Sequence, residues 1–184
     1  GTFKPVQADT MEGHDMHAEE TDVDIDTIRI IAAHQGPVFA VGTTALRSLE
    51  TLYWMGRKCA SNKNMDLRNT SLSQWEPYEM GMEGANRKEA LSALIACMEE
   101  SQLDRLCTRT ALLTAPGYEF KVVDGLVTNF HQPGSTLLLL VAAFMGDRWK
   151  EMYEEALKRG FRMLSFGDGC LLQRTLFRPA GNQG

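Results

Sequence analysis

The sequence has few cysteines, and none of them lies close to another. Cys59, Cys97, Cys107 and Cys170 form no Cys-x-x-Cys pair, which argues against zinc ribbons and thioredoxin-type redox motifs. Most of these residues stand in apolar or helical contexts, which is typical of reduced, buried thiols. We therefore expect a cytoplasmic protein.

Long hydrophobic runs are also missing. The longest apolar run without a charge, residues 137–145, is far shorter than the ~20 residues that a membrane-spanning helix needs. No signal peptide is recognisable. We expect no membrane partner.

Several catalytic motifs are absent as well. The chain has no G-x-S-x-G, P-loop, G-x-G-x-x-G or H-E-x-x-H sequence, which argues against serine hydrolases, P-loop NTPases and ordinary dinucleotide enzymes. Residues 13–20 hold His14, His17 and several carboxylates, so a metal-dependent hydrolase is one alternative. No apolar periodicity places these side chains on a helix, however, and we expect no metal.

The charge of the chain is modest and uneven. A net charge of −5 argues against a surface that coats nucleic acid uniformly. Residues 1–29 contain eight acidic and two basic side chains, whereas residues 45–68 contain five basic and two acidic ones. The second segment is either a local basic face or a mixed solvated surface, and its composition fits both.

The length and the order of the elements predict an α/β protein. A chain of 184 residues with 43% hydrophobic residues can build one substantial core. Apolar strand patterns alternate with helical ones, which favours a mixed, mostly parallel sheet flanked by helices. We expect one α/β domain over residues 1–178, a long loop or insertion at 59–86 and a flexible tail at 179–184.

Helical spacing of apolar residues predicts five helices. They cover 27–34 with Asp26 as N-cap, 45–55 ending at Gly56, 87–100, 136–145 and 147–158. Apolar runs predict strands at 38–41, 126–129 and 161–166. We also expect 109–114 to pair with 118–123, and 118–129 to form a hairpin.

The most informative segment is 122–144. A strand pattern runs into a polar turn at 129–136, and a strongly apolar helix follows. Ligands bind at the carboxyl ends of strands in open α/β sheets, and a helix start adds free N–H groups. Two further turns, Gly42-Thr43-Thr44 and Gly167-Asp168, also end predicted strands, so we expect all three to converge along one sheet edge.

The side chains in these turns allow two interpretations each. Thr43, Thr44, Ser135 and Thr136 either cap their helices or bind a carboxylate, phosphate or ribose hydroxyl. His131 either acts as acid, base or hydrogen-bond donor near neutral pH, or stabilises its turn.

Seven segments, in the same order, resemble the S-adenosylmethionine:tRNA ribosyltransferase-isomerases of queuosine biosynthesis. They are GTFKPV (1–6), MHAE (16–19), VGTTALRSLE (41–50), PGYEFKVVDG (116–125), NFHQP (129–133), STLL (135–138) and SFGD (165–168). The resemblance covers the C-terminal half of that family. It implies a fragment of a larger two-domain enzyme, without the family's small β-barrel domain.

The resemblance also implies the reaction. S-adenosylmethionine, the cosubstrate, gives its ribosyl group to a 7-aminomethyl-7-deazaguanine at the wobble position of a tRNA. The ribosyl group isomerises, epoxyqueuosine forms, and adenine and methionine leave. Such chemistry needs a base near the 5′ carbon, a proton donor for adenine and donors for the methionine carboxylate.

By the same resemblance, eleven residues are site candidates. His17, Glu19, His131 and Asp168 would be catalytic, with either histidine as acid or base. Asn129 would shape its turn or bind a base edge, and Arg47 would contact a carboxylate or phosphate. Its alternative is a surface salt bridge with Glu50. The expected substrate-binding residues are Gly42, Thr43, Thr44, Arg47, Asn129, Ser135 and Thr136.

Three positions depart from the family pattern. Gly134 replaces a lysine, Phe166 a tyrosine and Ala18 a serine. A second hypothesis is therefore a noncatalytic or paralogous nucleotide- or RNA-binding module on the same scaffold.

Overall fold

The computed structural model describes residues 16–62 and 64–174, and it confirms the α/β class. The chain forms two compact units. Among the described residues, unit 1 comprises 37–46 and 114–174, and unit 2 comprises 16–36 and 47–113. Instead of the one mostly parallel sheet that we expected, each unit has a small three-stranded sheet with one parallel and one antiparallel strand pair.

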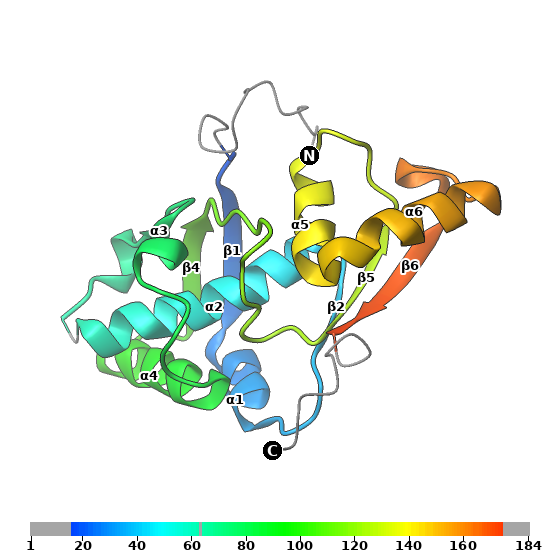
Figure 1. Cartoon of the computed structure of the whole chain (residues 1–184). Helices are drawn as coiled ribbons and strands as arrows, with labels where there is room; N and C mark the ends of the chain where they lie inside the picture. The colour runs from blue at the N-terminus through cyan, green and yellow to red at the C-terminus, as the bar shows by residue number, and fades with distance from the viewer. Residues whose placement is uncertain (1–15, 63, 175–184) are drawn as a thin grey trace, which may run out of the picture. The chain divides into compact units, whose positions relative to one another are not determined.

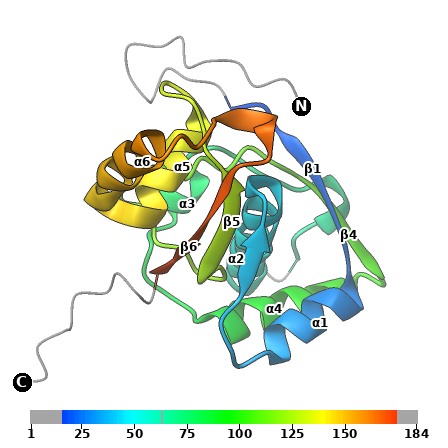
Figure 2. The same cartoon turned by 90° about the vertical axis from the view of Figure 1, so that its right-hand side faces the viewer.

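The sheet of unit 1 has the strand order β2-β5-β6 (Figures 1 and 2). β2 is parallel to β5, and β6 is antiparallel to β5. The strands are β2 (Phe39–Val41), β5 (Gly125–Asn129) and β6 (Gly169–Gln173). The helical segments are α5 (Thr136–Met145), η3 (Gly146–Arg148), α6 (Trp149–Lys158) and η4 (Leu164–Phe166).

Two strand predictions in unit 1 are wrong. Residues 118–123 form no strand and no hairpin with β5; their aromatic side chains pack inward, and Phe120 contacts both Tyr118 and Phe144 edge to face. Residues 161–166 form no strand either. Leu164 has a φ of 66°, which is incompatible with an extended ladder, and the last strand starts only at Gly169.

Unit 2 has the strand order β1-β4-β3, with β1 antiparallel and β3 parallel to β4. The strands are β1 (Glu19–Asp24), β3 (Ser71–Leu72) and β4 (Arg105–Thr110). The helices are α1 (Ile25–Ala33), α2 (Thr43–Ser61), whose first turn up to Leu46 belongs to unit 1, η2 (Leu67–Asn69), α3 (Glu76–Glu79) and α4 (Arg87–Glu100). Residues 59–86 therefore contain the end of α2 and three short elements.

Helix–helix packing builds the core of unit 2. α1 and α4 lie side by side (Figures 1 and 2). The predicted bounds of α4 are confirmed, and Asn86 with Glu89 forms a capping box at its start. The predicted stop at Gly56 is wrong. Gly56 lies inside α2, and a Cβ there would lie 2.0 Å from the carbonyl oxygen of Ala90 on α4. Glycine at this position therefore allows α4 to approach α2 closely.

Two smaller expectations have different outcomes. The N-cap of α1 is Asp24 and not Asp26; its carboxylate accepts the backbone N–H of Thr27. The expected tail at 179–184 lies outside the described residues. Within the described segments, no helix has the length and apolar character that crossing a bilayer requires.

Candidate functional site

Three polar turns meet at one edge of the sheet in unit 1, as predicted. β2 and β5 are parallel and end side by side, and the backbone N–H of Gly42 donates to the carbonyl of Val127 at 2.8 Å. β6 runs the other way, so it starts at this edge, with Gly169 opposite Asn129. The turn at Gly167 and Asp168 therefore precedes a strand here and does not follow one. We call this region the strand-end edge.

The first turn leads into α2. Gly42 has a φ of 91°, a backbone conformation that favours glycine, and its carbonyl accepts the first helical N–H, from Leu46. Thr43 is half-buried and Thr44 is exposed. Among the described residues, neither hydroxyl has a hydrogen-bond partner, so both are available to a ligand.

The second turn leads into α5, and Ser135 caps this helix. Its hydroxyl accepts the N–H of Leu138 at 3.2 Å and donates to the carbonyl of Gln132 at 2.7 Å. Thr136 is the first residue of the helix and is half-buried. Because the Ser135 hydroxyl already has both partners, the helix start offers a ligand its remaining N–H groups more readily than this oxygen.

His131 lies in the same turn and is only 7% exposed. Its Nε2 lies 2.8 Å from the hydroxyl of Thr128, and its backbone N–H donates to the hydroxyl of Tyr153 at 2.9 Å. Burial lowers the pKa of His131 below its ordinary value, because a desolvated imidazolium is disfavoured. The imidazole is therefore neutral at neutral pH.

Asn129 and Asp168 come together from different strands. The Asn129 side-chain amide donates to the backbone carbonyl of Asp168 at 3.1 Å. The carboxylate of Asp168 accepts from Nε of Arg162 at 2.9 Å and from its backbone N–H at 2.7 Å. These bonds hold the pKa of Asp168 below its ordinary value. A carboxylate engaged in this way fixes its loop and is a poor base.

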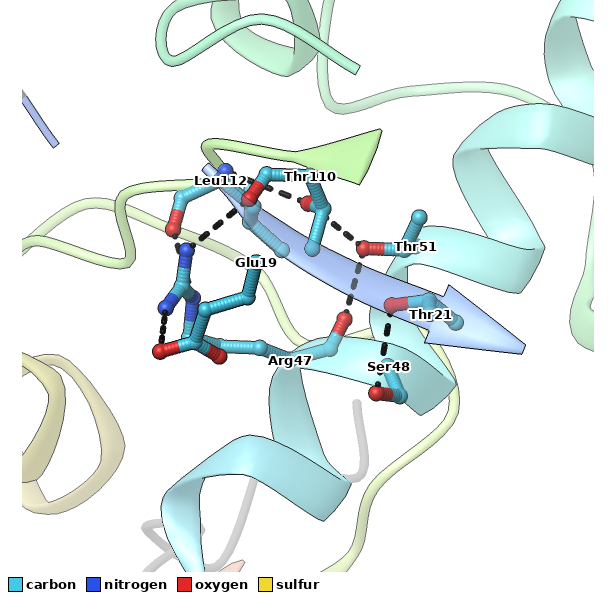
Figure 3. A network of polar contacts seen from close by, with 7 residues as sticks. All are labelled: Glu19, Thr21, Arg47, Ser48, Thr51, Thr110 and Leu112. Atoms are coloured by element: carbon cyan, nitrogen blue, oxygen red, sulfur yellow. Dashed lines mark hydrogen bonds and ion pairs between the residues drawn. The ribbon is translucent and has the colours of Figure 1, made fainter. Parts of the chain in front are cut away.

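In unit 2, Glu19 and Arg47 form an ion pair at 2.9 Å (Figure 3). Arg47 is only 5% exposed, and its guanidinium also donates to the carbonyls of Leu112 at 3.1 Å and Thr110 at 3.3 Å. Burial lowers the pKa of the Arg47 guanidinium below its ordinary value. The alternative interpretation, a surface salt bridge, is therefore wrong, because Arg47 is buried and links α2, β1 and the end of β4.

Hydroxyl groups extend this network. Thr51 donates to the carbonyl of Arg47 at 2.7 Å and lies 2.8 Å from the hydroxyl of Thr110, while Thr21 and Ser48 are 3.3 Å apart. Figure 3 shows these side chains between β1, β4 and α2. The polar groups satisfy one another, which is typical of a structural network.

His17 precedes β1 and is exposed. Within the described part of the chain, its side chain has no hydrogen-bond or ion-pair partner. The proposed metal pair cannot be compared with the structure, because His14 lies outside the described residues. Across 16–62 and 64–174, no group of three or more His, Cys, Asp or Glu side chains is arranged to hold a metal ion.

Sequence reasoning did not identify three residues that organise the strand-end edge. Thr128, Tyr153 and Arg162 bond to His131 or Asp168. Thr128 stands directly before the Asn-Phe-His turn, a position that could have indicated its role. Tyr153 is distant in sequence, and nothing local indicated it.

Three comparisons with known proteins, by family, by sequence and by structure, all match the same family. The family described as queuosine biosynthesis protein matches residues 1–172. The S-adenosylmethionine:tRNA ribosyltransferase-isomerases of Anaeromyxobacter sp. and Acidiphilium cryptum are 38% and 35% identical to this chain over 95% of it. A solved structure, S-adenosylmethionine tRNA ribosyltransferase from Thermotoga maritima, is 32% identical, with a TM-score of 0.52 over 83% of this chain.

The match covers only part of the length of the relatives. This chain spans 39% of the length of both curated relatives and 39% of the solved Thermotoga chain. Identity at this level, together with a family match over nearly the whole of the present sequence, is decisive for its ancestry. The chain belongs to the queuosine biosynthesis protein family.

Proposed function

We propose that this chain is the C-terminal part of an S-adenosylmethionine:tRNA ribosyltransferase-isomerase. The enzyme transfers the ribosyl group of S-adenosylmethionine to a 7-aminomethyl-7-deazaguanine in a tRNA anticodon and isomerises it, giving epoxyqueuosine. The observation that carries this proposal is the family match over residues 1–172. The names of the relatives support the reaction class.

The strand-end edge has chemistry that suits this cosubstrate. Thr43 and Thr44 present hydroxyls without partners among the described residues, and the start of α5 presents N–H groups. Such donors and acceptors bind carboxylates and ribose hydroxyls. The exposed amide of Asn129 can contact a base edge. We assign cosubstrate binding to this edge.

The catalytic roles follow from the protonation states. His131 is neutral, so we assign it a hydrogen bond or proton acceptance and not the role of a cationic acid. Asp168 keeps the edge in shape through Arg162. In unit 2, Arg47 positions Glu19, and exposed His17 remains a candidate acid or base.

The alternative is a noncatalytic or paralogous nucleotide- or RNA-binding module. One observation favours it: Gly134, which replaces the family's lysine, has a φ of 74°. A lysine at this position would be strained. Position 134 therefore does not supply the cation that could meet a phosphate or carboxylate there.

Calorimetric titration and turnover together test the proposal. The chain is titrated with S-adenosylmethionine, adenine and methionine, and the complete gene product is assayed for adenine release with precursor-bearing tRNA. We expect saturable binding of S-adenosylmethionine and tRNA-dependent release of adenine. Binding without release would favour the alternative, and the absence of both would contradict the assignment of this edge.

A further inference from the structure

The buried imidazole of His131 has one nitrogen held and one nitrogen available. Within the described chain, every buried side-chain nitrogen and oxygen has a hydrogen-bond partner, and the partner of this imidazole is at Nε2. Nδ1 has no partner among these residues, so it reaches solvent. Nδ1 is therefore the imidazole nitrogen with which a ligand at the turn after β5 can form a hydrogen bond.

Thr128 decides which of the two nitrogens carries the proton. Thr128 lies on β5 and is only 7% exposed, and among the described residues its hydroxyl oxygen has Nε2 of His131 as its side-chain partner. If Nε2 carried the proton, the hydroxyl hydrogen would be buried without an acceptor, which is unfavourable. If the hydroxyl donates to Nε2, both groups are satisfied.

We propose that Thr128 is a positioning residue that holds His131 in the neutral tautomer with its proton on Nδ1. This role rests on the proposed function, and it defines what His131 does there. Nδ1–H donates a hydrogen bond to an oxygen or nitrogen acceptor of the ribosyl or adenine unit. His131 does not remove the proton from the 5′ carbon, because its free nitrogen is already protonated.

The surroundings hold this arrangement in place. The hydroxyl of Tyr153, on α6, accepts the backbone N–H of His131 at 2.9 Å. The ring of Phe130 packs edge to face against Tyr153 and Phe161, with ring centroids 5.4 and 5.6 Å apart. The backbone is therefore fixed independently of the imidazole, so the two hydrogen bonds of His131 can be removed separately.

The direct test is nitrogen-15 NMR of the histidine side chains in this chain. H131Q assigns the resonances. We expect an unprotonated Nε2 and a protonated Nδ1 in the wild type, in T128S and in the matched control Y153F, which removes only the backbone contact. In T128V, Nε2 gains protonation, and the pKa of His131 rises because the donor that favoured the neutral form is lost.

Two results would overturn the assignment. One is a protonated Nε2 in the wild type, a measurement that needs no folded variant. The other is a wild-type tautomer and pKa in folded T128V.

Turnover of the complete gene product tests the consequence for the reaction. We expect T128V to lower kcat about tenfold with little change in KM, and T128S to restore it. Wild-type kcat in T128V would overturn the positioning role. No turnover in the wild type would contradict the proposed function, while the NMR result would still decide the tautomer.

Discussion

The polar network of unit 2 and the strand-end edge of unit 1 use similar residue types in opposite ways. Around Arg47, carboxylate, carbonyl and hydroxyl groups satisfy one another in a buried setting. At the strand-end edge, Thr44 and Asn129 are exposed and Thr43 is half-buried, and neither threonine hydroxyl has a partner among the described residues. The first arrangement stabilises the fold, whereas the second leaves donors and acceptors for a ligand. We therefore propose that the polar residues of the family motifs divide into a structural group and a ligand-binding group.

The comparison predicts that substitutions in the network change stability and that substitutions at the edge change binding. The largest effect on stability is expected for R47M. It leaves two carbonyls and Glu19 without their partner, so we expect the free energy of unfolding to fall by about 2–4 kcal/mol. Urea denaturation measures this, with R109M, an exposed arginine on β4, as control. Equal stability of R47M and R109M would show that the network is not structural.

S135A should have an intermediate effect. The substitution removes the N-cap of α5, which costs about 1 kcal/mol, and leaves the helix N–H groups in place. We expect lower stability and nearly unchanged binding of S-adenosylmethionine. T136A is the matched control, because Thr136 has no capping bond within the described residues. A loss of binding without a loss of stability in S135A would make this hydroxyl a ligand contact.

The pH dependence of stability should report His131. Its pKa is lowered in the folded state, so the unfolded chain binds more protons below the ordinary histidine pKa of about 6.5. Unfolding free energy should therefore decrease as the pH falls through this value and level off below the folded pKa. Denaturation at pH 7.5 and 5 compares the wild type with H131Q, in which this component should be missing. An identical pH dependence in both proteins would mean that His131 is not desolvated.

The smallest effect on stability is expected for N129A. Among the described residues, this exposed side chain makes one hydrogen bond, to the Asp168 carbonyl, so stability should change by only about 0.5 kcal/mol. Binding of S-adenosylmethionine should nevertheless weaken several-fold. Calorimetry measures the affinity and urea denaturation the stability. A variant that is destabilised but binds normally would place Asn129 with the structural residues.

The sequence predicted best those elements that local signals define. The bounds of α4 and α5 follow from capping residues and apolar runs. Asn86 and Ser135 are the N-caps, so they set the residue at which each helix begins. The strands were harder. Residues 118–123 have the alternation of a strand, but their aromatic side chains are buried in the core although the backbone pairs with no other strand of the described chain. Only the complete fold determines whether such a segment joins a sheet.

The candidate site shows the same limit. Convergence of the turns after β2 and β5 was predictable, because parallel strands bring their carboxyl ends to one edge. The reversal of β6 was not, and neither was the contact of Arg47 with Glu19, which depends on how α2 packs against β1 and β4. Long-range side-chain pairing is not encoded in local spacing. The carboxylate of Asp168 is bonded to Arg162, only six residues earlier, because residues 164–166 form a short 3-10 helix and not the predicted strand.

The most direct test of the account is an NMR titration of this chain with S-adenosylmethionine, with chemical-shift changes followed along the backbone. We predict saturable changes concentrated at 42–44, 129–136 and 167–169, with little change around Arg47. Saturable changes centred on the Arg47 network, or no changes at all, would contradict the assignment of cosubstrate binding to the strand-end edge.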